Sequence, residues 1–217
     1  MRFFVTISLF FELFKLFFSL NFLFYMLQYF MKTFNYTYNN KALDTLIDFN
    51  SFKNEKNILI QIFCGDKKSI LKEIATNILD NLPQAICIGS STDGEINNSK
   101  VTTCKTVISI STFENTKLKT AFVRRKDSFS NGVDLAKELC TEDTKLLITF
   151  SDGNKTNGES FLKGIQSVNH NVMVSGGMAG DNANFRQTFI SSQNQIVTNG
   201  AVGVALDSKV LKVCNAF

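Results

Sequence analysis

The chain has 217 residues, a formal net charge of +4 at pH 7 and 44% hydrophobic residues. This length fits one large domain or two small ones, and a small charge scattered along the chain predicts a protein that does not bind nucleic acid. Five cysteines without a C-x-x-C pair argue against a zinc site and fit a reducing, cytoplasmic compartment.

Residues 1–30 differ in composition from the rest, being rich in Phe and Leu and devoid of Gly, Pro and Asp. A membrane helix needs about 20 apolar residues, but the charged residues Glu12 and Lys15 interrupt the apolar stretch and leave its uninterrupted part shorter than that. A signal peptide would end in a cleavage site made of small residues, and no such site comes after the apolar stretch. The favoured interpretation is that translation starts at Met31, because in-frame upstream DNA of an A/T-rich genome encodes much Phe and Leu. An inner-membrane anchor through residues 1–30, if they are translated, is the alternative.

From Met31 onward, apolar runs predict alternating strands and helices. Residues 57–63 read as a buried strand, and apolar residues recur at helical spacing over 70–79. Pro83 ends that helix, and a second strand follows at 85–88. A strand–helix–strand unit of this kind predicts two parallel strands in one sheet.

The middle of the chain predicts a β-hairpin, because a polar turn at 114–117 joins extended runs at 101–113 and 118–123. The densest basic run, Arg124-Arg125-Lys126, is interpreted as the solvated end of this hairpin. The later elements are a helix at 132–140, a strand at 146–150, a helix opening with a capping box at 156–159, and strands at 172–174, 185–191 and 195–206. Together they predict a mixed α/β domain over 31–217, or an α+β one, with one central sheet, flanking helices and a hairpin.

Two glycine-rich segments, 86–95 and 172–181, each follow an apolar strand and contain an Asp. Small residues let the backbone approach a ligand closely, so the composition favours binding of a small polar molecule. A phosphate-binding P-loop is excluded because Glu95 stands where its Lys would be, and the dinucleotide spacing G-x-G-x-x-G is absent.

Three motifs, Gly89-Ser-Ser-Thr-Asp-Gly-Glu95, Gly176-Gly-Met-Ala-Gly-Asp181 and Asn199-Gly-Ala-Val-Gly-Val-Ala-Leu206, resemble the FIST N-terminal domain. The resemblance covers about residues 32–217. It implies a sensory module of intracellular signal transduction, of the kind found in bacteria, that binds small ligands such as amino acids. It also implies a following C-terminal FIST domain and a signalling output domain or protein as partner, so this chain is expected to be the N-terminal part alone.

Three turns, at residues 89–95, 151–154 and 175–181, each follow a predicted strand. They are expected to converge on one pocket rim if those strands are parallel neighbours. Hydroxyl and main-chain groups would hold a carboxylate, and Asp152 or Asp181 an ammonium group. The alternative is that both aspartates cap loops. Gly177 is expected to allow a close main-chain approach, either to a ligand or to the first glycine-rich segment. The candidate ligand-binding residues are Ser90, Ser91, Thr92, Gly94, Asp152, Gly176, Gly177, Gly180 and Asp181.

Catalytic, metal-binding and cofactor-binding residues are not predicted. His170 is the single histidine and lies in a polar turn away from any candidate nucleophile, and no G-x-S-x-G elbow is present. Two alternatives stay open. One is a haem-binding nitric-oxide sensor, which the family resemblance implies and for which His170 would be the axial ligand. The other is an enzyme of unrecognised type.

Overall fold

The structure is a computed structural model that describes residues 31–214. Residues 32–214 lie in one compact unit. The predictions about residues 1–30 fall outside the described residues and stay predictions. Within the described part of the chain, no helix is long and apolar enough to cross a membrane.

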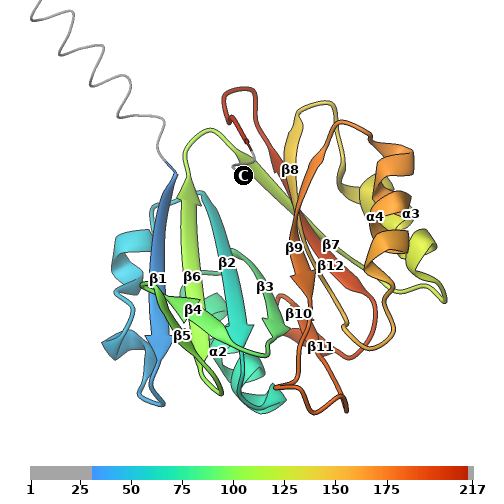
Figure 1. Cartoon of the computed structure of the whole chain (residues 1–217). Coiled ribbons are helices and arrows are strands. Elements are labelled where there is room, and N and C mark those ends of the chain that lie inside the picture. The colour runs from blue at the N-terminus through green and yellow to red at the C-terminus, as the bar shows by residue number, and fades with distance from the viewer. Residues whose placement is uncertain (1–30, 215–217) are drawn as a thin grey trace, which may run out of the picture. The chain divides into compact units, whose positions relative to one another are not determined.

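Most strands belong to two large sheets (Figure 1). The first contains, in spatial order, β1 (Lys32–Tyr38), β6 (Thr106–Phe113), β2 (Asn57–Cys64), β3 (Ile86–Ser91), β10 (Ile190–Ser192) and β11 (Gln195–Val197). The second contains β7 (Lys117–Val123), β12 (Ala201–Asp207), β8 (Thr144–Ser151) and β9 (Met173–Met178). The short strands β4 (Glu95–Asn97) and β5 (Lys100–Thr102) pair with each other.

The helices cover the outer faces of these sheets. Helix α2 (Lys68–Asn81) and the 3₁₀ turns η1 (Leu43–Thr45) and η2 (Phe49–Phe52) pack on the first sheet. Helices α3 (Ser128–Leu139) and α4 (Gly158–Val168) pack side by side on the second (Figure 1). The order of layers is therefore helix, sheet, sheet, helix.

The period-two alternation of strand side chains explains how each sheet is buried on both faces. On β2, Ile58, Ile60 and Ile62 join the core under α2, whereas Leu59 and Phe63 join the core between the sheets. A strand whose two faces are both covered reads as one continuous apolar run, and this is the pattern of β2.

The α/β class predicted from the sequence is confirmed, but the single central sheet is wrong, because the strands divide between two stacked sheets. The predicted hairpin is also wrong. Strand β6 pairs with β1 and β2, whereas β7 pairs with β12 in the other sheet. The polar turn between them carries the chain from one sheet to the other. A turn signal is local, and it does not specify which strand each arm will pair with.

The predicted strand–helix–strand unit is confirmed, because β2 and β3 are parallel and α2 connects them. The two glycine-rich segments differ from the prediction, since β3 continues to Ser91 and β9 to Met178. Their glycines at 89, 176 and 177 lie within strands rather than in turns. The capping box is displaced by one residue: the side chain of Asn157, not Thr156, accepts the Ser160 N–H and begins α4.

Candidate functional site

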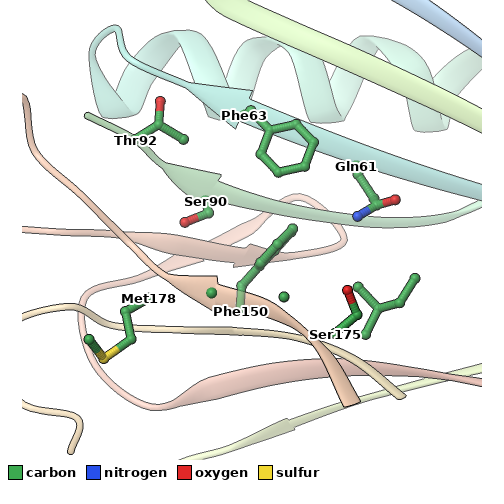
Figure 2. Close-up of a pocket in the computed structure, with 10 residues that line it drawn as sticks. Gln61, Phe63, Ser90, Thr92, Phe150, Ser175 and Met178 are labelled. Atoms are coloured by element: carbon green, nitrogen blue, oxygen red, sulfur yellow. The ribbon is translucent and has the colours of Figure 1, made fainter. Parts of the chain in front are cut away.

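A cavity of about 350 Å³ opens between the two sheets. Strands β2 and β3 form one wall and β8 and β9 the other (Figure 2). Its volume is in the range of small-molecule sites. The lining residues are Gln61, Phe63, Ser90, Thr92, Ile148, Phe150, Ser175, Gly176, Gly177 and Met178.

Strand alternation places the apolar part of this lining. Phe63 on β2 and Phe150 on β8 point toward each other across the inter-sheet space, with ring centroids 5.6 Å apart and an edge-to-face angle of 72°. Edge-to-face pairs are a preferred aromatic geometry. Ile148 lies two residues before Phe150 and therefore on the same face of β8. These side chains give the cavity an apolar surface against which a small ligand can pack.

The polar part of the lining is neutral. The Ser90 hydroxyl donates to the Ser91 carbonyl oxygen at 2.9 Å, and the Thr92 hydroxyl donates to Glu95 Oε1 at 2.6 Å. Both hydroxyl oxygens keep lone pairs with which to accept from a ligand. Gln61 and Ser175 add an amide and a third hydroxyl. None of the ten described residues in the lining carries an ionisable side chain.

One wall of the cavity is the edge strand β9. It pairs with β8 on one side only, and its last four residues, Ser175–Met178, are exposed. Alternate backbone groups of an edge strand point away from the sheet and are available for hydrogen bonding. The cavity therefore has main-chain donors and acceptors beside its hydroxyl groups.

The two central glycines of β9 have different surroundings. Gly176 has a φ of +135°, and a Cβ there would overlap the carbonyl oxygen of Thr149. At Gly177, by contrast, a Cβ would meet no atom within 4 Å. A close approach of Gly177 to the first glycine-rich segment is therefore not observed, and its approach to a ligand stays a prediction. The glycine in close main-chain contact is Gly176, beside Thr149.

The structure does bring the two glycine-rich motifs together, through their loops. Asp93 Oδ1 accepts the Asp181 N–H at 2.8 Å and the Ala183 N–H at 3.1 Å, while the Gly180 N–H donates to the Ser91 carbonyl oxygen at 2.9 Å. A Cβ on Gly180 would lie 2.5 Å from the Asp93 side chain. This contact joins the motifs as packed loops beside the cavity.

Asp181 binds its own loop. Its carboxylate accepts the backbone N–H groups of Phe185 at 2.9 Å, Arg186 at 2.6 Å and Gln187 at 3.1 Å. The hydrogen bond from Arg186 is the main cause that lowers the pKa of this carboxyl below its ordinary value, because it favours the charged form. These contacts match the loop-capping alternative for Asp181.

Asp152 lies away from the inter-sheet cavity. It is 2% exposed, and it accepts the Lys155 N–H at 2.7 Å, the Thr156 hydroxyl at 3.0 Å and the Gly200 N–H at 3.2 Å. It holds the loop between β8 and α4 against the start of β12. This too is the geometry of a capping carboxylate.

Four of the predicted ligand residues line the cavity: Ser90, Thr92, Gly176 and Gly177. Ser91 is buried and its Oγ accepts the Phe189 N–H, while Gly94 lies against Thr102. Six other lining residues were not predicted from the sequence: Gln61, Phe63, Ile148, Phe150, Ser175 and Met178. Gln61 carried a usable signal, because it is the one polar residue within the apolar run from Ile58 to Phe63.

His170 is exposed in the turn between α4 and β9 and does not line the inter-sheet cavity. Among residues 31–214, no group of three or more His, Cys, Asp or Glu side chains is arranged to hold a metal ion. His170 therefore lies outside the candidate site.

The FIST N domain family model matches residues 58–216, from β2 through the last strand. The chain belongs to the FIST N family. A search of curated proteins found no match. The family consists of sensory domains of signal transduction and is not a known enzyme family. In this FIST N domain, the matched region contains every residue that lines the inter-sheet cavity.

Proposed function

We propose that this FIST N domain senses a small amino acid with an uncharged side chain, bound in the inter-sheet cavity. The observation that carries the proposal is the composition of that cavity. It combines the free edge of β9, neutral hydroxyl and amide groups, and an apolar aromatic surface.

An amino acid matches each part of this lining. Its carboxylate can accept from strand N–H groups, the Gln61 amide and the Ser175 hydroxyl. Its ammonium group can donate to strand carbonyl oxygens and to the lone pairs of the Ser90 and Thr92 hydroxyls. The ligand would then pair with β9 as one residue of a further strand would. Its side chain would lie toward Phe63 and Phe150 (Figure 2).

The same lining disfavours ligands with charged side chains. The backbone carboxylate and ammonium groups of the ligand would be matched by strand N–H and carbonyl groups, but a charged side chain would lie toward Phe63 and Phe150. Burying a charge there costs several kcal/mol, because no ionisable group among the described residues lines the cavity to pair with it. We therefore expect uncharged amino acids to bind more tightly than lysine or glutamate of similar length.

The cavity also offers a route to a signalling partner. Met178 lines the cavity, and its sulfur lies 3.5 Å from the position of a Cβ on Gly158, the first residue of α4. A ligand that repositions Met178 would act on the start of this helix. We propose that an output domain or protein responds to that change, in keeping with a sensory role.

Titration calorimetry of the full chain against a panel of amino acids tests the proposal. Gln61→Leu removes the amide from the cavity, and Gly177→Val fills open space beside it. Each is expected to weaken binding of an uncharged amino acid at least tenfold. The matched control is Gln195→Leu, which makes the same change at an exposed residue on β11 outside the cavity and should bind as the parent chain does.

The absence of binding for every uncharged amino acid would remove the proposal. Equal weakening by Gln61→Leu and Gln195→Leu would show that the cavity is not the site. A Soret absorption band in the purified protein, lost in His170→Ala, would instead support the haem alternative.

A further inference from the structure

A second cavity lies at one end of the four-stranded sheet. Strands β7 and β8 both run antiparallel to β12 and therefore point in the same direction. Their last residues, Val123 and Ser151, both pair with Ala201. Each strand then enters a loop that leads to a helix, β7 to α3 and β8 to α4. The carboxyl ends of strands in α/β folds are the usual place for ligands.

The two helices begin side by side at this end. The Ser128 hydroxyl in the first turn of α3 accepts the backbone N–H of Asn157, the N-cap of α4, at 2.9 Å. Further along, Gly132 and Gly164 pack in close contact, so the helices run in the same direction. Their positive dipole ends therefore lie together, which favours an anion nearby.

Basic side chains from both loops line the space between these features. The cavity measures about 330 Å³, and its lining includes Arg124, Arg125, Lys126 and Lys155. Arg125 pairs with Asp134. The other three have no ion-pair partner among residues 31–214. Their charges are available to a ligand.

The two acidic residues in the lining keep their negative charges but bind their own loops, and the four basic side chains still leave the lining with a net positive charge. Asp127 Oδ1 accepts the Ser130 N–H at 2.7 Å, and both carboxylate oxygens of Asp152 accept hydrogen bonds from its own loop and from Gly200. The lining also contains Asn199, whose buried Oδ1 has no hydrogen-bond partner among the described residues. As an acceptor, this oxygen can bind a P–OH group of a protonated phosphate, but it adds no attraction for the charged oxygens.

We propose that this cavity binds a phosphate group, either as the free ion or as part of a small phosphorylated molecule. A phosphate group carries multiple charges and several acceptor oxygens, which suit two lysines and a free arginine better than a single carboxylate would. The basic run 124–126, interpreted from the sequence as a solvated hairpin end, is then one wall of a site. This site is separate from the inter-sheet cavity and does not depend on the function proposed for it.

The test is titration calorimetry of the full chain in a buffer without phosphate, using inorganic phosphate and phosphoserine as probes. Arg124→Gln combined with Lys155→Gln removes one charge from each loop and is expected to weaken phosphate binding at least tenfold. The matched control is Lys117→Gln combined with Lys145→Gln. It removes the same charge from exposed residues at the opposite ends of β7 and β8 and should change the affinity less than twofold.

Both probes binding with similar affinity would support a site for the phosphate group alone, and tighter phosphoserine binding would support a site that also contacts the attached molecule. The absence of binding for both probes would overturn the proposal. So would an equal loss in the two double variants, because it would indicate attraction to a diffuse positive surface. Gly177→Val should leave phosphate binding unchanged, which separates this site from the amino-acid site.

Discussion

At the scale of single residues, the adjacent glycines of β9 have opposite requirements. No side chain fits at Gly176, because its φ of +135° is unfavourable for other residues and the Thr149 carbonyl oxygen occupies the space where a Cβ would lie. Gly177 lies against open space at the cavity. One glycine therefore keeps β9 close to β8, and the other keeps the cavity open.

We expect Gly176→Ala to lower the free energy of unfolding by about 2 kcal/mol or more, because it combines backbone strain with an overlap against a main-chain atom. Gly177→Ala, the matched control on the same strand, should change it by less than about 0.5 kcal/mol. Urea unfolding of both variants measures the difference. Equal losses would contradict the assignment of separate roles to the two glycines.

The burial of Cys87 predicts that the free energy of unfolding depends on pH. Burial raises the pKa of this thiol from its ordinary value of 9.0 to about 12, because a thiolate is poorly solvated in an apolar core. Because the pKa is higher in the folded chain than in the unfolded one, the contribution of Cys87 to the free energy of unfolding is complete below pH 9. It is lost as the pH rises toward 12.

The free energy of unfolding should accordingly fall with pH above 9, and Cys87 should account for up to about 1.4 kcal/mol per pH unit of that slope. Cys87→Ala removes the titrating thiol. Its stability should therefore fall less steeply over this range than that of the parent chain, as measured by urea unfolding at a series of pH values. Identical slopes would show that Cys87 ionises without unfolding.

At the scale of secondary structure elements, α3 and α4 pack through two glycines. A Cβ on Gly132 would overlap the Phe161 carbonyl oxygen, and a Cβ on Gly164 would overlap that of Phe129. The missing side chains let the helix backbones approach closely. The same contact holds their first turns together at the edge of the basic cavity.

Gly164→Ala should therefore destabilise the domain by about 2 kcal/mol or more, even though alanine is favoured over glycine in helices by about 1 kcal/mol. Gly158→Ala is the matched control on α4, since a Cβ there meets only the Met178 sulfur at an ordinary 3.5 Å. It should be neutral or slightly stabilising. Thermal unfolding compares the two, and a gain in stability for Gly164→Ala would refute the close helix contact.

At the scale of the whole molecule, the stacked sheets create the space in which a ligand can bind. Leu59 and Ile88 of one sheet pack with Val202 and Val204 of the other in a shared core. The candidate cavity continues the same inter-sheet layer, lined by Phe63 and Phe150. A ligand there would contact both sheets and stabilise their spacing.

A chain that begins at Met31 is expected to fold, because residues 32–214 form a compact unit with its own cores. Its far-UV circular dichroism and cooperative thermal unfolding should be those of a folded α/β protein. Failure of this shortened chain to unfold cooperatively would show that residues 1–30 are needed for the fold. Mass spectrometry of the native protein tests the predicted start directly, and a peptide that begins at Met1 would contradict it.

Local patterns in the sequence determined the α/β class and the parallel β2–α2–β3 unit, because apolar periodicity and Pro83 act within a few residues. The glycine motifs also predicted Ser90, Thr92, Gly176 and Gly177 as site residues, and these four line the inter-sheet cavity. Pairing of strands distant in the chain was decided only by the tertiary structure. A strand buried on both faces looks the same whether a helix or a second sheet covers it. For the same reason, only the stacking of the two sheets places Gln61 and Phe150 at one cavity. Asp152 and Asp181 bind their own loops, and a sequence pattern of Asp beside Gly or Asn does not distinguish such a contact from ligand binding.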